Sequence, residues 1–176
     1  GFWNNRHLIS EAIRSIDPDI VLLNHTGVPP KPLKLYGYNT RYTVGTVHDG
    51  VAVMVKNTIK HLHITDWPSE HFLATKIHTQ HGQFLVATTY ARPNTGLPLN
   101  SLTNLFNNTN IPVYILADLN AAHRAFHHNS NNRHGQELLM ITQLKRLRFL
   151  GPDFPTCFSY HGSGRPDLIP VSYTHL

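Results

Sequence analysis

The chain has 176 residues, of which 40% are hydrophobic and 14% are charged. This composition excludes the low hydrophobicity and high charge of disordered chains, and the length suits one compact domain. Fifteen Lys and Arg against ten Asp and Glu give a net charge of +5 with His neutral, which favours polyanionic partners without identifying one.

Helical spacing of apolar residues predicts a first helix from Leu8 to Ile16, and the apolar run 20–23 predicts a buried strand after it. The prolines at 29, 30 and 32 interrupt regular structure. Beyond them, β-rich runs predict five strands, at 41–44, 51–55, 59–64, 72–77 and 84–90. The first half of the chain is therefore expected to be mostly sheet.

The second half begins with a short amphipathic helix at 100–106, followed by a buried strand at 113–116. A longer helix is predicted at 136–147, with Lys145, Arg146 and Arg148 near its C-terminal end, where cations favour the helix dipole. Segments 155–159 and 168–169 are candidate last strands. No repeat or internal boundary is visible, so mixed α/β layers are expected in a domain over residues 1–170, followed by an atypical tail at 171–176.

Several kinds of protein are disfavoured by the sequence. No stretch approaches the roughly 20 apolar residues of a membrane-spanning helix, so we expect no membrane partner. The first residues do not resemble a secretory signal, and no other targeting signal is visible. The single Cys157 excludes an intrachain disulfide and a multi-cysteine zinc site. These features predict an intracellular location, nuclear or cytoplasmic.

Asp118 and Asn120 directly follow the apolar run 113–116. Open α/β sheets place their sites at strand ends, and the one-residue gap lets both side chains point towards the same crevice. A carboxylate and an amide there could activate water and hold a phosphoryl group. The ordinary alternative for an isolated Asp-x-Asn is an Asx turn or a helix cap, so the rest of the sequence has to decide.

Other segments supply that context in a fixed order. They are Asn4-Asn5-Arg6-His7-Leu8, Asp17 to Asn24, Gly50-Val51-Ala52-Val53, Thr89-Tyr90-Ala91-Arg92-Pro93, Ala117 to His123, Gly135 to Leu139, Pro155-Thr156 and Ser163 to Ile169. With these blocks the sequence resembles the endonuclease/exonuclease/phosphatase superfamily, especially the endonuclease domain of non-LTR (LINE-type) retrotransposons. Each block is weak alone, but their order and spacing together are fairly specific.

The resemblance implies a DNase I-like fold, a four-layer α/β sandwich of two packed mixed β-sheets with helices on the outer faces. It implies metal-dependent phosphodiester hydrolysis that nicks target DNA, with Mg²⁺ or Mn²⁺ as cofactor. It also implies a reverse transcriptase domain in the full-length protein. The alternatives are a small phosphate-ester or phosphoinositide phosphatase of the same superfamily, and a non-catalytic DNA-binding relic.

The resemblance also implies four catalytic residues. Asp118 would orient or deprotonate the attacking water, and Asn120 would hold a phosphoryl oxygen. Tyr90 would hydrogen-bond the phosphate, and Asp167 would support the site from a later strand. Outside this group, Asn4 would lie beside the metal, and substrate contacts are expected from Thr156 and His123.

The sequence departs from the family pattern in two places. The metal-ligating Glu of the family maps onto His25, and imidazole is a poor substitute for an oxygen ligand of Mg²⁺. Two interpretations stay open: a site suited to Mn²⁺ or Zn²⁺, or a decayed and inactive copy. The closing Asp-His pair of the family is absent from residues 171–176, which suggests C-terminal truncation or a foreign tail.

Two residue groups invite further functions. His123, His127, His128 and His134 lie in or near a polar loop, and we interpret them as solvated and not as a zinc site. Cations scattered along the chain could form a phosphate-contacting surface if the fold gathered them. They are Arg41, Lys56, Lys60, Lys76 and Arg92.

Overall fold

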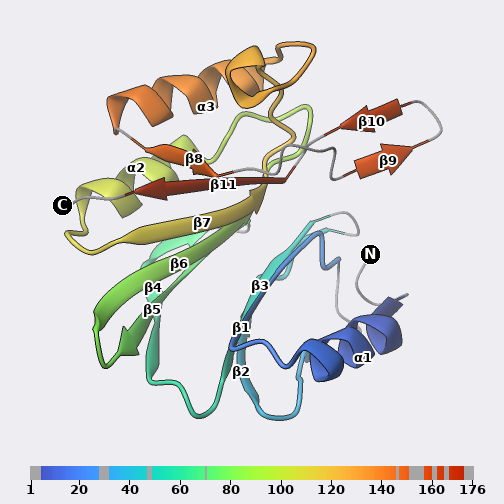
Figure 1. Cartoon of the computed structure of the whole chain (residues 1–176), viewed down its shortest axis with the longest axis vertical. Helices are drawn as coiled ribbons and strands as arrows, with labels where there is room; N and C mark the ends of the chain where they lie inside the picture. Colours follow the sequence, from blue (N-terminus) through green and yellow to red (C-terminus); the bar gives the residue numbers. More distant parts are fainter. Residues whose placement is uncertain are drawn as a thin grey trace.

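Two β-sheets face one another in the computed structural model, with helices on the outer sides (Figure 1). The structure describes residues 5–27, 32–46, 49–69, 71–145, 147–150, 157–159, 162–164 and 167–172. Within this part of the chain, the larger sheet has the strand order β4-β5-β6-β7-β11-β8 and the smaller sheet has the order β1-β3-β2. None of the described helices is both long and apolar enough to cross a membrane.

The smaller sheet consists of β1 (Ile20–Asn24), β2 (Tyr38–Tyr42) and β3 (Val51–Lys56), with β3 in the centre and antiparallel to both neighbours. Side chains alternate between the two faces of a strand, and β3 is apolar on both. Its three valines pack towards the larger sheet, whereas Ala52 and Met54 pack in a separate cluster on the other face. Helix α1 (Arg6–Ile16) lies on that outer side (Figure 1).

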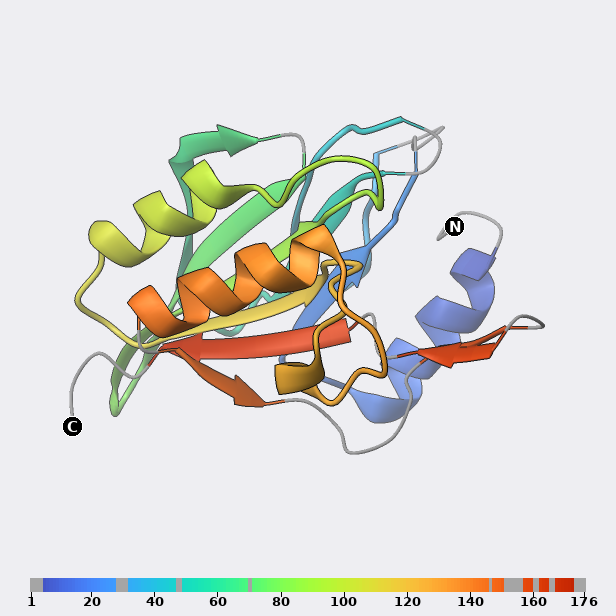
Figure 2. The ribbon, with the colours of Figure 1, turned by 90° about the horizontal axis from the view of Figure 1, so that it is seen from above.

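The larger sheet is mixed. Its strands are β4 (His61–Ser69), β5 (Phe72–Thr79), β6 (Gly82–Tyr90), β7 (Val113–Asp118), β8 (Arg148–Leu150) and β11 (Asp167–Ser172). β6 and β7 are parallel and the other pairs are antiparallel. Helices α2 (Leu99–Asn107) and α3 (Arg133–Leu144) lie side by side over its outer face (Figure 2). A separate hairpin pairs β9 (Cys157–Ser159) with β10 (Gly162–Gly164).

Two apolar cores hold these layers together. Between the sheets, the valines of β3 pack against Leu73, Ile77 and Val86. On the opposite face of the larger sheet, α2 and α3 cover a second cluster that includes Leu105 and Ile115, both fully buried. Burial on both faces explains why β3 is apolar from Val51 to Val55 and why the middle of β6 is apolar from Phe84 to Ala87. The predicted two-sheet α/β sandwich with outer helices is therefore confirmed.

Some element boundaries differ from the sequence prediction. β2 covers residues 38–42 and not 41–44, because Thr43 leaves the strand and its Oγ1 accepts a hydrogen bond from Val51 N at 3.0 Å. α3 begins at Arg133 and not at residue 136, because Asn132 caps it: its Oδ1 accepts from Gly135 N at 2.8 Å. The helix ends at Leu144 and not at residue 147, so Lys145 is its C-cap and Arg148 already belongs to β8.

The last described strand, β11, is longer than the strand predicted at 168–169. β11 continues through Val171 and Ser172, which pair with Tyr114 and Val113 of β7. The strand thus runs two residues past the boundary at 170 that the sequence suggested. The division into a domain over 1–170 and a tail at 171–176 stays a prediction.

His63 on β4 contacts strands of both sheets. Its Nδ1 lies 2.7 Å from Thr75 Oγ1 on β5, and its Nε2 lies 3.2 Å from Asn39 Oδ1 on β2. Burial, and then the nearby charges of His61 and Arg41, lower the pKa of His63 from 6.5 to about 4. The imidazole is therefore neutral in the folded protein at neutral pH.

We expect His63 to make the fold acid-sensitive. Between pH 6.5 and 4 the unfolded chain binds a proton that the folded chain resists, so this stability is present above pH 6.5 and lost as pH falls through 4. After a discount for partial exposure, the loss is about 1–2 kcal/mol. Urea unfolding at pH 7 and pH 4.5 should show a smaller pH effect in His63→Gln, whereas the exposed His81→Gln should match wild type. An equal pH effect in both variants would contradict this assignment.

Candidate active site

Several strands have an end at the same edge of the sandwich. β6 ends at Tyr90 and β7 at Asp118, and the parallel register places these two residues side by side. β11 begins at Asp167, which pairs directly opposite Asp118 in the antiparallel register. Three predicted catalytic positions therefore form one row across three adjacent strands, although nothing in their sequence spacing required it.

The turn after β7 is an Asx turn that also holds Ala91, next to Tyr90. Asn120 N donates to Asp118 Oδ1 at 3.2 Å, and Asn120 adopts a left-handed φ of 45°. The Asn120 side chain donates from Nδ2 to Ala91 O at 2.9 Å, and it lies near enough to the Tyr90 hydroxyl to influence its pKa. Ala91 N in turn donates to Asp118 O at 2.9 Å. The ordinary Asx turn and the predicted site are thus the same structure.

The surroundings of Tyr90 determine its protonation state. Burial raises the pKa of the Tyr90 hydroxyl, and the negative charges of Asp118 and Asp49 raise it further. Arg92 and the Asn120 side chain act in the opposite direction without reversing the shift. Tyr90 therefore keeps its proton at neutral pH and can donate a hydrogen bond to an anionic substrate, but cannot serve as a base.

His25 lies beside Tyr90. It follows β1 with a left-handed φ of 57°, and its imidazole stacks on the Tyr90 ring with centroids 5.5 Å apart and planes inclined by 17°. The predicted metal position is thus adjacent to Tyr90, the residue predicted to contact phosphate. Stacking fixes this imidazole through its ring face, which is a packing contact and not metal coordination.

Asn24, which the sequence did not single out, links the two sheets under the site. Its amide nitrogen donates to Thr88 Oγ1 at 2.7 Å and Thr89 O at 3.3 Å, and its oxygen accepts from Asp118 N at 3.0 Å. We assign this orientation because it satisfies both ends of the amide, whereas the opposite one satisfies neither fully. The end of β1 is thereby bound to the end of β7.

The other predicted site residues have varied outcomes. Asn4 and Thr156 lie outside the described residues, and Asp167 is described by its backbone alone. His123 Nδ1 accepts from Ala125 N at 3.1 Å, and its ring packs edge-on against Phe126. This ring caps the short 3₁₀ helix Arg124–Phe126, so its predicted contact with substrate stays a prediction.

The N-terminal end of α3 supports the Asx turn from behind. Asn132 Nδ2 donates to Asn120 O at 2.7 Å, and its Oδ1 accepts from Ala122 N at 2.9 Å. His134 is buried, and its Nδ1 lies 2.7 Å from Leu119 O. The sequence offered one signal for this arrangement, since Asn is a favoured helix cap and Asn132 precedes the apolar periodicity.

Gly135 is essential to this close approach, because a Cβ there would lie 1.9 Å from Ala122 O. Backbone cannot yield as a flexible side chain can, so Gly135→Ala is expected to destabilise the fold by about 3 kcal/mol. Urea unfolding measures this loss. Gly96→Ala is the matched control, because its nearest contact would be the flexible Arg133 side chain at 3.4 Å. Equal stability of the two variants would contradict the predicted clash.

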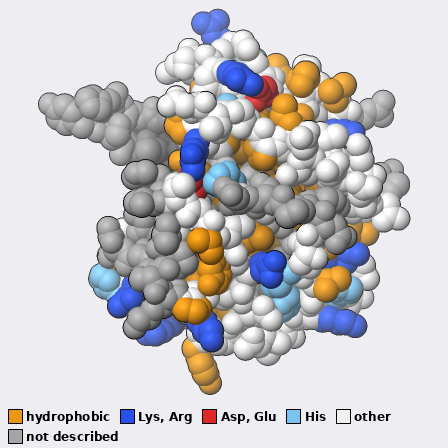
Figure 3. All heavy atoms as spheres, turned by 180° about the vertical axis from the view of Figure 1, so that it is seen from behind, with side chains coloured by type: hydrophobic (Ala, Val, Ile, Leu, Met, Phe, Trp, Pro, Cys, Tyr) orange, Lys and Arg blue, Asp and Glu red, His pale blue; other side chains and the backbone are white. Residues whose placement is uncertain are grey.

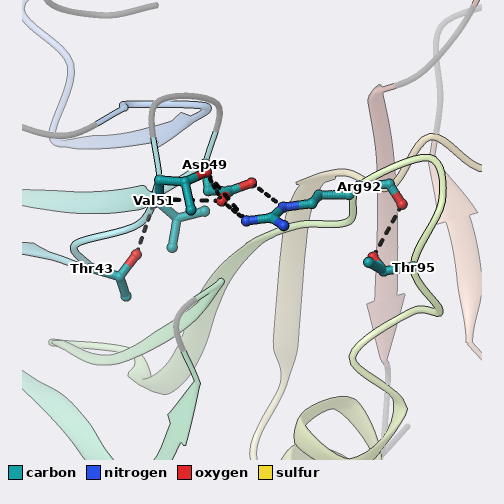
Figure 4. A network of polar contacts seen from close by, with 6 residues as sticks. Thr43, Asp49, Val51, Arg92 and Thr95 are labelled. Carbon is teal, nitrogen blue, oxygen red and sulfur yellow. Dashed lines mark hydrogen bonds and ion pairs between the residues drawn. The ribbon is translucent and has the colours of Figure 1, made fainter.

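A partly buried ion pair joins the loops of the two sheets next to the site (Figure 4). Arg92 Nε donates to Asp49 Oδ1 at 2.6 Å, and Arg92 Nη2 donates to Asp49 Oδ2. The Asp49 side chain is fully buried, whereas 39% of the Arg92 side chain is exposed. The Arg92 guanidinium holds the pKa of the Asp49 carboxyl far below its usual range. The sequence had marked Arg92 within the block Thr89 to Pro93 and among several scattered cations, but it had not marked Asp49.

Lys56, another cation of that group, lies away from the site. It is at the opposite end of β3, where its Nζ contacts Asp17 Oδ2 at 2.9 Å and Asp19 Oδ1 at 3.3 Å. On the face drawn in Figure 3, the Lys and Arg side chains are spread and not collected in one patch. A general phosphate-contacting surface is therefore not assembled from them on that face, and Arg92 is the member that lies beside Tyr90.

The donors described at the site do not by themselves fit a divalent cation. Hard cations such as Mg²⁺ take oxygen ligands, usually from more than one carboxylate when the protein supplies the site. Among the described residues, no group of three His, Cys, Asp or Glu side chains is arranged to hold a metal. Asp118 offers one carboxylate, and Asn24 uses its amide oxygen within the protein. No catalytic step is therefore derived through a metal.

Known proteins resemble this chain in sequence pattern and fold. The sequence profile of the endonuclease/exonuclease/phosphatase family matches residues 2–169. No curated protein gives a significant sequence match. Among solved structures, the chain resembles the endonuclease domain of TRAS1, a telomere-specific non-LTR retrotransposon, with a TM-score of 0.77 and 14% identity over 94% of this chain and 78% of that one.

Two further solved structures show the same fold. One is a 3′ phosphatase from Neisseria bound to a product DNA hairpin, with a TM-score of 0.71. The other is an AP endonuclease from Archaeoglobus fulgidus, with a TM-score of 0.68. Each is 15% identical over 98% of this chain and 83% of its own. At such identities the likeness establishes the fold alone.

Proposed function

This chain belongs to the endonuclease/exonuclease/phosphatase family, and from that premise we propose that it hydrolyses phosphodiester bonds of DNA as the endonuclease domain of a non-LTR retrotransposon. The observation that carries the proposal is the row of Tyr90, Asp118 and Asp167 across adjacent strands. The likeness to the TRAS1 endonuclease domain supports the retrotransposon branch. The net charge of +5 suits a polyanionic substrate.

Three residues with described side-chain interactions divide the chemical work in this proposal. Asp118 orients the attacking water and accepts its proton, because it is a carboxylate at the end of β7. Tyr90 donates its hydroxyl hydrogen bond to a phosphoryl oxygen, and its raised pKa keeps that proton in place. Asn120 lies near the Tyr90 hydroxyl, and its side chain is fixed by the hydrogen bond to Ala91 O. In this proposal its amide holds a phosphoryl oxygen, as the family resemblance implies. Fixed donors of this kind stabilise charge that develops in the transition state.

Other parts of the proposal rest on the family resemblance. Asp167 supports Asp118 from β11, and Asn4 lies beside a metal with His25 at the position of the family Glu. Thr156 and His123 contact the DNA. Mg²⁺ or Mn²⁺ supports the reaction, and a reverse transcriptase domain occupies the same full-length protein.

Nicking of supercoiled plasmid tests the proposal. The chain is incubated with Mg²⁺, with Mn²⁺ and with chelator, and conversion to the open circle is followed on a gel. Activity with either metal, lost with chelator and in Asp118→Asn, supports the assignment. If His25 has left this copy inactive, the variant His25→Glu should nick the plasmid in the same assay. The proposed function is contradicted if neither wild type nor His25→Glu nicks the plasmid and Asp118→Asn has no effect in any assay.

The same preparation distinguishes the alternatives. Hydrolysis of a small phosphate ester or a phosphoinositide without nicking would assign the chain to a phosphatase branch of the family. Salt-sensitive DNA binding that persists without metal and survives Asp118→Ala, in a chain that shows no hydrolysis with any metal, would identify a non-catalytic binding module.

A further inference from the structure

The Asp49–Arg92 pair has a rigid geometry. The Asp49 carboxylate accepts from Arg92 through both oxygens, and also from Thr46 Oγ1 and from Thr46 N at 3.3 Å. Arg92 Nη2 lies 3.3 Å from Thr46 Oγ1 as well. Two parallel hydrogen bonds from a planar guanidinium fix its orientation in a way that a single contact cannot. The buried carboxylate therefore sets the plane of the Arg92 head group.

The pair lies between the Tyr90–Asp118–Asn120 part of the site and the turn that follows His25. Arg92 follows Tyr90 by two residues, and the intervening Ala91 is hydrogen-bonded to Asp118 and Asn120 through its N–H and its carbonyl. On the other side, Asp49 O accepts from Gly27 N at 2.5 Å, in the turn that follows His25. Figure 4 shows the Arg92 side chain extending from its loop towards the loop of Asp49. Both charges are close enough to Tyr90 to influence its hydroxyl.

Two glycines allow the Asp49 loop to pack this closely. A Cβ on Gly45 would lie 2.6 Å from Asp49 Cβ. A Cβ on Gly50, whose φ is 91°, would lie 2.4 Å from Thr26 Oγ1. Thr26 N in turn donates to Gly50 O at 3.0 Å. Asp49 and Gly50 are therefore packed closely against Gly45 and Thr26.

The exposure of the two partners is unequal. Asp49 is fully buried, but 39% of the Arg92 side chain is exposed, on the loop that directly follows Tyr90. An Arg oriented by a buried carboxylate is pre-organised for planar recognition of phosphate. We propose that Arg92 contacts a phosphate of bound DNA and that Asp49 positions it for that contact. This proposal rests on the proposed function and adds a substrate-binding residue to it.

A purely structural ion pair is the alternative, and the two roles differ in one measurable quantity. Each phosphate that a protein neutralises contributes about 0.9 to the slope of log Kobs against log salt concentration on duplex DNA. A pair that only joins the sheets contributes nothing to that slope. Lys56 with Asp17 and Asp19 is such a pair, at the other end of β3 and about 16 Å along the strand.

The experiment measures binding to a short DNA duplex in chelator, which prevents cleavage, over a series of salt concentrations. The main variant is the double substitution Arg92→Gln with Asp49→Asn, which keeps the net charge and leaves no unpaired buried charge. Its slope should fall by about 0.9, so a fourfold rise in salt should cost it about 3.5-fold less affinity than it costs wild type. Lys56→Gln is the matched control and should keep the wild-type slope.

Arg92→Lys supplies a second measurement if the double variant fails to fold. It keeps the positive charge but loses the planar fork, so its slope should match wild type while its affinity falls several-fold. A folded double variant with wild-type affinity and slope would overturn the proposed role of Arg92, and so would wild-type affinity in Arg92→Lys. Neither result would bear on the proposed function. A wild-type chain without any salt-dependent DNA binding would overturn the proposed function and this inference with it.

Discussion

Replacing Asp118 with Asn should lower the rate of DNA nicking by about 100- to 10,000-fold, the range that a general base contributes. The amide has the same shape and its oxygen can still accept the Asn120 N–H, so the Asx turn stays intact. It cannot accept a proton from water at neutral pH. Single-turnover nicking, measured in the most active form of the chain, gives the change in the chemical step.

Asp17→Asn is the matched control for that experiment. Asp17 is an exposed carboxylate next to Lys56, at the end of the sandwich away from Tyr90. Its substitution should leave the nicking rate unchanged, and thermal unfolding should show that both variants remain folded. A rate in Asp118→Asn within a few-fold of wild type would remove Asp118 from the proposed mechanism.

Replacing His25 with Glu should raise the rate of Mg²⁺-supported nicking by about 10- to 100-fold or more. Mutating residues that only hydrogen-bond a metal ligand already changes activity by that factor. The substitution places a second carboxylate near Tyr90 and Asp118, where the described residues offer one. Oxygen ligands suit Mg²⁺ far better than imidazole does. Metal binding has a readout of its own, because a cation that binds only the folded chain raises its Tm.

His25→Gln is the control that separates charge from shape. It also removes the imidazole stacked on Tyr90, but it adds no negative charge. We expect Mg²⁺ to raise the Tm of His25→Glu and to leave that of His25→Gln unchanged. If both variants gain equal activity, release of Tyr90 from the stack explains the gain and a metal ligand does not. If neither gains and Mg²⁺ shifts neither Tm, His25 does not occupy a metal position.

The fold was predictable where local pattern and burial agree. The strand at 51–55 has apolar residues on both faces because it is central in its sheet and covered on both sides. β2 begins three residues and ends two residues before its predicted limits, because these depend on pairing with β3, which no local pattern encodes. The start of α3 depends on the Asn132 cap, a local signal that the apolar periodicity from residue 136 outweighed.

The site was predictable only in part, for a related reason. Tyr90, Asp118 and Asn120 belong to segments whose order resembles a known family, and the strand register brings them together. The partnership of Asp49 and Arg92 spans 43 residues and depends on how two loops meet. Neither residue has a sequence neighbour that indicates the other. Contacts of this kind follow from topology. The sequence therefore marked Arg92, in the block 89–93 and among the cations, but indicated neither Asp49 nor its contact with Arg92.

The loops of the site carry backbone hydrogen bonds of the kind usually found inside sheets. Ala91 N and Thr26 N donate to carbonyls of neighbouring segments, although both residues lie outside strands. Their amides should exchange with deuterium nearly as slowly as those of β6, which native-state exchange can measure. On the proposed function, segments that are held in this way before binding would leave part of the adjustment to the duplex. Sequences that bend or unwind easily should then be cut first.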